Sequence, residues 1–259
     1  MGKNVLNCNQ PDSAQVMYKG KKISLILPTF NEKDSIKKVI NEFEELEIVD
    51  EILVINNNAA KGTSYEIAGT SAIEIMESEQ GYGSAIIRGF KESRGDLIVV
   101  CEPDDTFLAT DIHKLLSYSE DVDIVYGSRT YKELIWSGAN TGWFLRFGNW
   151  VVAKLLEVLF NTNTLTDVGC TYRLVHRNVI LELLPLFKIK SNFFGPEMMA
   201  RGYIRKYKCI QIPVVYKERI GTSSVTGNLL KAFTLGIKMI LLLFTLKFRI
   251  DKTVLKFLK

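Results

Sequence analysis

Three carboxylates follow one of the most apolar segments of the chain. Residues 97–101 are short and apolar, as a buried strand is, and Glu102, Asp104 and Asp105 come directly after them. Carboxylates this close repel one another unless they share a cation or pair with bases. A hard divalent ion such as Mg²⁺ or Mn²⁺ takes one or two carboxylates and keeps positions for water and phosphate oxygens. The cluster therefore indicates a metal–diphosphate site, although a solvated turn at Pro103 explains the tetrapeptide equally well.

Polar and glycine residues also follow or precede other apolar runs. Residues 23–27 lead into Pro-Thr-Phe-Asn-Glu at 28–32, and residues 52–55 lead into three asparagines. Gly81 and Gly83 open a helical pattern ahead of the acidic segment, and N–H groups at a helix N-terminus suit a phosphate. A lone Gly-x-Gly is weak evidence. Four such motifs in this order are more specific and favour the metal interpretation.

The elements that would position these motifs alternate in the first half of the chain. Strand-like runs lie at 23–27, 52–55, Ile73–Met76, 97–101, 122–126 and 210–216, with a further segment near 168–175; helical patterns lie at 35–46, 83–93, 111–118, Trp143–Phe160 and 178–184. This alternation predicts an α/β fold with a mainly parallel sheet and helices on both faces. Ligands bind beyond the carboxyl ends of such strands, where the motifs lie.

The bulk properties indicate one domain at 21–227 with two appendages. Residues 1–20 lack the apolar stretch of a signal peptide and are expected to be a loose extension. No run of about 18 apolar residues occurs, so no transmembrane helix is expected. The four cysteines are far apart, which indicates neither a disulfide framework nor a zinc site but reduced thiols in a cytosolic protein.

The second appendage, 228–259, is strongly basic. It holds seven Lys or Arg against one acid, whereas the rest of the chain holds 26 basic and 28 acidic residues. Lys231, Lys238, Thr245 and Lys252 form a narrow polar stripe along an otherwise apolar helix. The pattern suits a helix in a membrane interface, with lysines near anionic headgroups. Packing on the domain or on a second subunit is the alternative. Nucleic acid is not expected, because aromatic residues do not alternate with the basic ones.

From residue 23 to residue 248 the chain resembles the GT-A glycosyltransferases of family 2, in the dolichol-phosphate mannosyltransferase-like branch. The resemblance implies a GT-A (Rossmann-like) fold, a UDP- or GDP-sugar donor, and Mg²⁺ or Mn²⁺. It places Pro28, Phe30 and Glu32 beside the nucleotide base and Gly81 and Gly83 beside the nucleoside.

The acidic segment matches the metal motif of that family. Asp104 is then the principal metal ligand, with Glu102 as its partner; the role of Asp105 is left open. Arg129 follows a Gly-Ser pair and would lie near the diphosphate or the acceptor phosphate. Arg219 belongs to a stretch that folds over the donor phosphates in relatives.

Two more residues fall on the acceptor side of the family pattern. Arg173 ends a segment that begins at Asp167, and Glu197 matches an acid near the acceptor channel. Each of the three arginines could instead form a structural ion pair. Glu197 could equally be a helix N-terminal carboxylate interacting with the helix dipole.

Three departures from the family pattern matter. Asn56 and Asn57 stand where relatives carry two aspartates that recognise the base; the Asn57 carbonyl can still accept from a base N–H, so the choice of UDP or GDP stays open. Glu102 replaces an aspartate. Ser224 replaces a common lysine and removes a positive charge near the phosphates.

The resulting hypothesis is an inverting transfer of a hexose to a polyprenyl phosphate by an enzyme peripheral on the cytoplasmic face of a membrane, with a homo-oligomer possible. A phosphate acceptor is already anionic near pH 7 and needs no dedicated base, whereas a hydroxyl acceptor would need one, Glu197 or Asp167. The alternatives are a family 2 enzyme that extends a lipid-linked or surface glycan, and a nucleotide-binding, membrane-associated protein without turnover.

Overall fold

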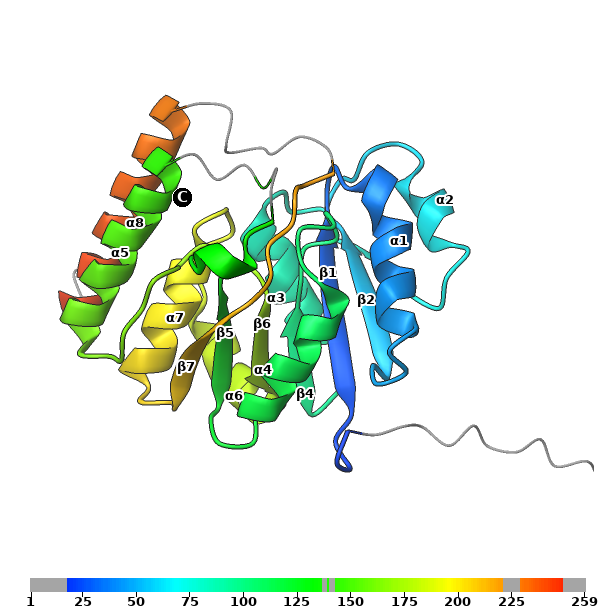
Figure 1. Cartoon of the computed structure of the whole chain (residues 1–259), viewed down its shortest axis with the longest axis horizontal. Helices are drawn as coiled ribbons and strands as arrows, with labels where there is room; N and C mark the ends of the chain where they lie inside the picture. Colours follow the sequence, from blue (N-terminus) through cyan, green and yellow to red (C-terminus); the bar gives the residue numbers. More distant parts are fainter. Residues whose placement is uncertain (1–17, 137–138, 140–142, 221–228, 249–259) are drawn as a thin grey trace, which may run out of the picture.

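A seven-stranded sheet forms the centre of the computed structural model, which describes residues 18–136, 139, 143–220 and 229–248 (Figure 1). Its strands are β1 (Ile23–Thr29), β2 (Glu51–Asn56), β3 (Ile73–Met76), β4 (Leu97–Val100), β5 (Ile124–Ser128), β6 (Arg173–His176) and β7 (Cys209–Pro213), in the order β3-β2-β1-β4-β6-β5-β7. Strand β6 is antiparallel to β4 and β5, and the other neighbours are parallel. The predicted α/β class with a mainly parallel sheet is confirmed.

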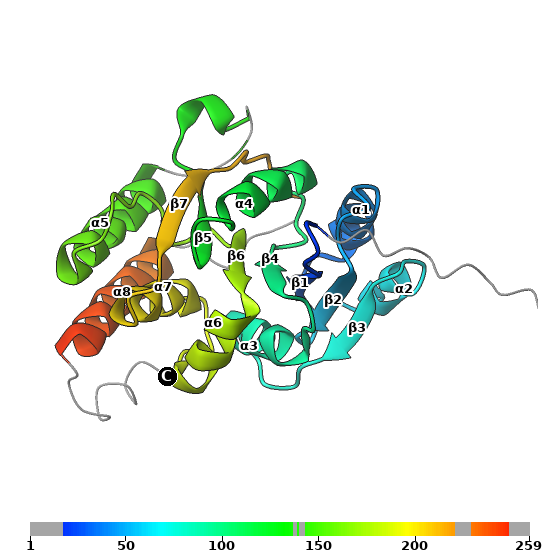
Figure 2. The same ribbon diagram turned by 90° about the horizontal axis from the view of Figure 1, so that it is seen from below.

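Helices cover both faces of the sheet, as its apolar strands require (Figure 2). Alternate residues of β1 enter different cores: Leu25 and Leu27 pack with α1 (Lys33–Glu44) and α4 (Ile112–Tyr118), whereas Ile26 packs with α3 (Tyr82–Glu92). The helices α6 (Arg177–Leu183) and α7 (Phe194–Ile204) lie on the α3 side. Because both faces are covered, the strand ends are left for the chemistry.

A pair of long helices packs beside α7. Helix α5 (Trp143–Phe160) lies along α8 (Leu229–Phe248), as Figures 1 and 2 both show. Leu242 and Leu243 of α8 are fully buried and belong to the same core as Leu156 of α5. In the part of the chain that the structure describes, no helix is long and apolar enough to cross a membrane.

One short helix, α2 (Thr63–Ile67), is absent from the sequence prediction. Helix α7 was expected only as a helix N-terminus at Glu197, and it begins at Phe194 with Gly195 and Pro196 in its first turn. Proline is tolerated in the first turn of a helix because the N–H that it lacks has no partner there. Of the segment near 168–175, only its last three residues are strand, and β7 ends at Pro213 rather than at Tyr216.

The predicted polar stripe on the C-terminal helix is only partly observed. Thr245 is 4% exposed and donates a hydrogen bond from Oγ1 to the Leu241 carbonyl at 2.7 Å, so it faces the protein. That part of the prediction is wrong, because burial of Leu242 and Leu243 turns Thr245 inward as well. Lys252 and the side chain of Lys231 lie outside the described residues, as do most of 1–20.

Candidate active site

The two predicted metal ligands meet at one guanidinium. Glu102 and Asp104 follow β4, and Arg219 lies in the segment after β7, at the same edge of the sheet. Arg219 Nη2 is 3.0 Å from Glu102 Oε2 and 2.5 Å from Asp104 Oδ2. The fold thus brings together residues more than a hundred positions apart, with both carboxylates directed at one cation.

Asp104 is buried, and only one of its two oxygens accepts hydrogen bonds. Oδ1 accepts from the backbone N–H of Thr106 at 3.1 Å and from its hydroxyl at 2.6 Å. Oδ2 has no hydrogen-bond partner, and its contact with Arg219 is an ion pair without hydrogen-bond geometry. A buried carboxylate oxygen that accepts no hydrogen bond is a candidate metal ligand, and here it faces only the Arg219 guanidinium. The site therefore fits a divalent ion held by Asp104 and Glu102.

The number of carboxylates is also suitable for such an ion. Among the described residues no group of three or more His, Cys, Asp or Glu is arranged to hold a metal. Two carboxylates alone match the preference of Mg²⁺ for one or two protein ligands supplemented by phosphate oxygens and water. The remaining coordination positions would be left for oxygen ligands from outside the protein.

The carboxyl group of Glu102 has a raised pKa. Burial and the neighbouring Asp104 carboxylate raise its pKa to about 7, although Arg219 and Arg129 act in the opposite direction. A quarter of its side chain remains exposed. A bound divalent cation would favour the ionised form of Glu102, since an opposite charge nearby stabilises it.

Asp105 points to a different set of partners. Its carboxylate lies 2.6 Å from Lys38 Nζ of α1 and 2.5 Å from Lys217 Nζ. Although burial alone would raise the pKa of Asp105, the hydrogen bonds from Lys217 and Lys38 lower it. Both oxygens are occupied by lysines, so Asp105 fixes the acidic turn and is not among the candidate ligands.

Arg129 is held beside this cluster by Asp167. Its Nε and Nη2 donate to the two oxygens of Asp167 at 2.9 and 3.0 Å, and the carboxylate also accepts from Asn149 and from the Gly169 N–H. Although burial would raise the pKa of Asp167, Arg129 lowers it to about 2. The guanidinium lies 5.3 Å from the centre of the Tyr216 ring. Arg129 thus offers a fixed positive charge near Glu102.

Arg173 and Glu197 are not brought to the acidic pair. Arg173 is 5% exposed and donates to the backbone carbonyls of Cys170, Val168 and Gly195 at 2.7, 3.1 and 3.2 Å. These contacts favour the structural alternative, because its donors serve the protein itself.

Glu197 is equally enclosed. It is fully buried and accepts from the guanidinium of Arg201 at 2.6 Å and from the backbone N–H groups of Lys188 and Ile189. The carboxylate organises the segment before α7. This arrangement favours a structural role over that of an acceptor-side base.

The residues expected beside the base differ in how accessible they are. Pro28 is buried in β1 opposite Ile55. The Phe30 ring is 42% exposed and could stack on a base. Glu32 accepts from the backbone N–H groups of Phe30 and Asn31 at 2.7 and 2.8 Å, so it shapes the loop that presents the ring.

Asn57 has all of its hydrogen-bonding capacity in use. Its Nδ2 donates to the carbonyls of Glu77 and Glu79, both at 2.9 Å. Its Oδ1 accepts from the Gly81 N–H at 2.7 Å and from Gln80 at 3.2 Å. An amide offers two donors and two acceptor positions. In this arrangement Asn57 positions the glycine turn, and no capacity is left for a nucleotide base.

The two glycines of that turn are required by packing. A Cβ at Gly81 would lie 2.1 Å from the Lys190 carbonyl oxygen, and one at Gly83 would lie 2.5 Å from that of Ile189. Gly81 also has φ of +144°. The Ser84 N–H in the first turn of α3 donates to Lys190 at 3.1 Å. The glycines therefore allow the backbone of 189–190 to approach closely.

Sequence reasoning missed Lys217 and Tyr216 of the segment after β7, and Asn149 of α5. Lys217 and Arg219 lie two positions apart after β7, and both pair with carboxylates of the acidic turn. Their charge, opposite to that of the turn, was the available signal. Nothing in the sequence linked Asn149 to Asp167.

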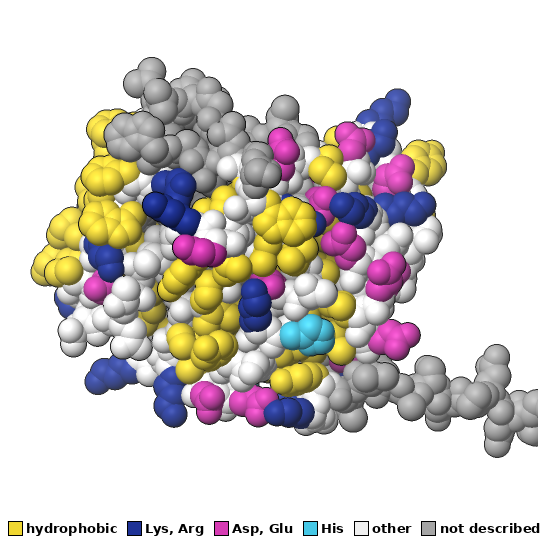
Figure 3. Space-filling view, in the orientation of Figure 1, with side chains coloured by type: hydrophobic (Ala, Val, Ile, Leu, Met, Phe, Trp, Pro, Cys, Tyr) yellow, Lys and Arg dark blue, Asp and Glu magenta, His cyan; other side chains and the backbone are white. Residues whose placement is uncertain are grey.

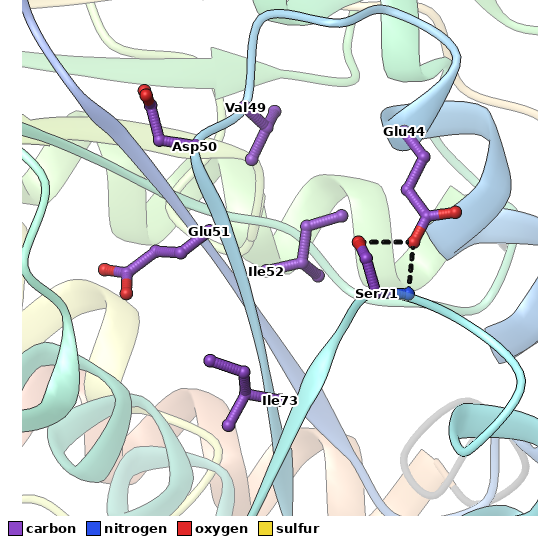
Figure 4. Close-up of a pocket in the computed structure, with 7 residues that line it drawn as sticks. All are labelled: Glu44, Val49, Asp50, Glu51, Ile52, Ser71 and Ile73. Carbon is purple, nitrogen blue, oxygen red and sulfur yellow. Dashed lines mark hydrogen bonds between the residues drawn. The ribbon is translucent and has the colours of Figure 1, made fainter. Parts of the chain in front are cut away.

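A separate depression of about 390 Å³ lies at the amino ends of β2 and β3, the opposite edge of the sheet from the acidic pair (Figure 4). Its polar groups already pair within the protein. Glu44 accepts from the Ser71 N–H and hydroxyl at 2.7 and 2.6 Å, and Asp50 accepts from the Ile23 N–H at 2.7 Å. We assign it no ligand.

Comparisons with known proteins place the chain in a family. A family model described as "Glycosyl transferase family 2" matches residues 24–184. The chain is 27% identical over 210 residues to "Undecaprenyl-phosphate 4-deoxy-4-formamido-L-arabinose transferase" of Sodalis glossinidius, covering 76% of this chain and 60% of that protein. It is 26% identical over 209 residues to "Low-salt glycan biosynthesis hexosyltransferase Agl6" of Haloferax volcanii, covering 78% and 49%.

Solved structures share the fold. Glucosyl-3-phosphoglycerate synthase from Mycobacterium tuberculosis in complex with phosphoglyceric acid superposes with a TM-score of 0.70 at 16% identity, covering 90% of this chain and 82% of that one. The same enzyme with Mn²⁺, UDP and phosphoglyceric acid gives 0.68 at 15%, covering 88% and 79%. The chain spans only 60% and 49% of the two curated relatives, so their complete activities are not carried over directly.

Proposed function

Because the chain belongs to glycosyl transferase family 2, we propose that it moves a hexose, with inversion, from a nucleotide-diphosphate sugar to a polyprenyl phosphate. The observation that carries the proposal is the convergence of Glu102 and Asp104 on one cation position at the carboxyl end of β4. The buried Asp104 Oδ2, which accepts no hydrogen bond, supports the proposed metal dependence.

Each charged residue of the site then has a task. Asp104 and Glu102 would hold Mg²⁺ or Mn²⁺, which supplies Lewis-acid neutralisation of the leaving diphosphate. Arg219 and Arg129 contribute further positive charge where negative charge accumulates on the leaving group. Phe30 provides an exposed ring on which a base can stack, and either uracil or guanine suits it.

The state of the candidate bases supports a phosphate acceptor. Asp167 is bound bidentately by Arg129, and Glu197 is enclosed by Arg201 and two backbone N–H groups. Neither is available to take a proton from a sugar hydroxyl. A polyprenyl phosphate needs no such base, and the name of the relative from Sodalis glossinidius also refers to undecaprenyl phosphate.

The outer face of α5 and α8 supports binding of the protein to a membrane surface. We propose that the protein binds the cytoplasmic face of that membrane. Large exposed apolar side chains on α8 recur at helical spacing: Phe233, Ile237, Leu241, Phe244 and Phe248. Phe147, Trp150 and Val158 of the neighbouring helix α5 are also exposed. Hydrophobic side chains gather at this edge of the molecule (Figure 3). A patch of this kind marks an interaction surface.

The charges around this apolar face suit anionic lipids. Arg146 and Lys247 are exposed on the two helices, and α8 contains no acid. The one acid of α5, Glu157, is paired with Lys154 at 2.7 Å. Apolar side chains flanked by cations bind at the interface of anionic membranes. A second copy of the chain is the competing occupant of the face.

A transfer assay tests the central proposal. Purified protein is incubated with Mn²⁺ and labelled UDP- or GDP-sugars, with and without polyprenyl phosphate. Lipid-soluble label that requires polyprenyl phosphate supports the proposal. Transfer only to a lipid-linked glycan would favour the chain-extending alternative, and nucleotide binding without any turnover would favour a non-catalytic protein.

Vesicle flotation tests the membrane surface. Replacing Phe244 and Phe248, 37% and 60% exposed, by serine should lower binding to phosphatidylglycerol vesicles about tenfold or more, since each ring loses burial in lipid. Tyr65→Ser, at an 86% exposed position on α2, is the matched control. A wild-type dimer that dissociates in the Phe variant, with no vesicle binding in either protein, would assign the face to a second subunit instead.

A further inference from the structure

The segment 217–220, here named the strap, lies across the acidic turn. Its first residue, Lys217, donates its backbone N–H to the Thr106 carbonyl at 2.7 Å. At its other end the Ile220 N–H donates to the Asp104 carbonyl at 3.2 Å. Backbone hydrogen bonds therefore fasten the strap to the turn on both sides of Arg219.

The Lys217–Asp105 ion pair anchors the strap in the protein. The two side chains are 11% and 9% exposed, so water screens the 2.5 Å contact only weakly. The backbone of Asp105 adopts φ of +62°, a left-handed conformation that is uncommon outside glycine but that Asp adopts more readily than most residues. Helix α1 secures the same turn, because the Ser35 hydroxyl donates to the Pro103 carbonyl at 2.6 Å. The acidic turn is thus held by the strap on one side and by α1 on the other.

The position of Arg219 follows from this anchor. Arg219 lies two residues beyond Lys217, and its side chain reaches both Glu102 and Asp104. Its guanidinium occupies the point on which the two carboxylates converge. A divalent ion bound by the same oxygens needs that point.

We propose that Arg219 is an internal cation that competes with the divalent metal for Glu102 and Asp104, with the Lys217–Asp105 pair as the fixed anchor of its strap. The inference rests on the proposed function, since it takes this acidic pair as the metal site. A nucleotide diphosphate gives the displaced guanidinium a new anionic partner, because Arg binds phosphate oxygens well. Metal and nucleotide therefore bind cooperatively, and metal alone binds weakly.

Mn²⁺ titrations followed by the electron paramagnetic resonance of the free ion test this competition without any turnover. In the absence of nucleotide, Arg219→Ala should bind Mn²⁺ about tenfold more tightly than the wild type, because a charge-assisted contact no longer competes. Arg219→Lys, which keeps the charge but lacks the planar fork, should lie between them. With UDP or GDP present the difference should shrink or reverse, since Arg219 then assists the diphosphate.

Two lysine variants isolate the anchor. Lys217→Met and Lys38→Met each remove one positive charge from Asp105, but only Lys217 belongs to the strap. Lys217→Met should tighten Mn²⁺ binding several-fold more than Lys38→Met does. Circular dichroism melts verify that each variant is folded.

Two outcomes overturn the inference in distinguishable ways. Equal or weaker Mn²⁺ binding by Arg219→Ala, with the wild type binding Mn²⁺ in the presence of nucleotide, refutes the competition alone. Failure of the wild type and of Arg219→Ala to bind Mn²⁺ with or without nucleotide refutes the metal site, and the competition with it.

Discussion

The two halves of the carboxyl edge of the sheet differ in how their polar groups are satisfied. On the β1–β2–α3 side, Asn57 makes four hydrogen bonds within the protein, and Glu32 accepts two backbone N–H groups of its own loop. On the β4–β5 side, two carboxylates face one guanidinium and a buried oxygen of Asp104 accepts no hydrogen bond. Groups that are fully hydrogen-bonded build a rigid wall, whereas two carboxylates that share one guanidinium can exchange it for another cation.

Replacing Asp104 is expected to have the largest effect. Asp104→Asn keeps the shape of the side chain but removes the charge that holds the metal. It should lower the metal-dependent turnover number by about 10³-fold, as loss of a major electrostatic contribution does. Initial rates at saturating Mn²⁺ measure it, and circular dichroism verifies that the variant is folded. Turnover within tenfold of the wild type would mean that the acidic half is not the reactive one.

A glycine on the other half should affect stability instead of chemistry. Gly83→Ala places a methyl group 2.5 Å from the Ile189 carbonyl oxygen, and the backbone must shift to accept it. We expect a loss of about 3 kcal/mol in the free energy of unfolding, with Mn²⁺ affinity of the folded protein unchanged. Urea denaturation measures the loss.

Gly148→Ala is the matched control, because a Cβ there meets nothing within 4 Å and alanine favours a helix. This variant should be as stable as the wild type or more so. If Gly83→Ala were equally well tolerated while nucleotide affinity fell, the glycine turn would be a phosphate-binding element, and the contrast between the halves would be lost.

The same contrast explains what could be predicted from sequence. The strand-end motifs identified the sheet, its mainly parallel class and the family, because apolar runs and turn residues are local signals. Charged residues such as Arg173 and Glu197 can be identified in the sequence, but the groups that they contact cannot. Arg173 binds carbonyls up to 22 residues away, and Glu197 depends on how the segment at 188–189 folds back on it.

The assignments within the candidate site divide along the same line. Glu102, Asp104 and Arg219 meet only because β4 and β7 end at the same edge of the sheet, which follows from topology and not from spacing. Asn57 was expected to face a base because relatives carry an aspartate there. Its four contacts with residues 77–81 depend on loop packing that no periodicity encodes.

Asp167 is an exception on the β4–β5 side, because its charge is fully paired with Arg129. Its pKa is about 2 in the folded protein, against an ordinary 3.8. A carboxyl whose pKa is lowered by folding contributes stability above its unfolded pKa and loses it as the pH falls through the folded value. The shift corresponds to about 2 kcal/mol, which should be present at pH 7 and decline between about pH 4 and pH 2.

Urea unfolding of the wild type and of Asp167→Asn across this pH range measures the contribution. The wild type should be the more stable protein at pH 7, and the difference should narrow steadily below pH 4. A difference independent of pH would show that Asp167 acts through shape and hydrogen bonding alone. Since Arg129 is held by this carboxylate, Asp167→Asn should also bind the nucleotide-sugar donor more weakly. Asp167 would then be a positioning residue, which acts on the donor through Arg129.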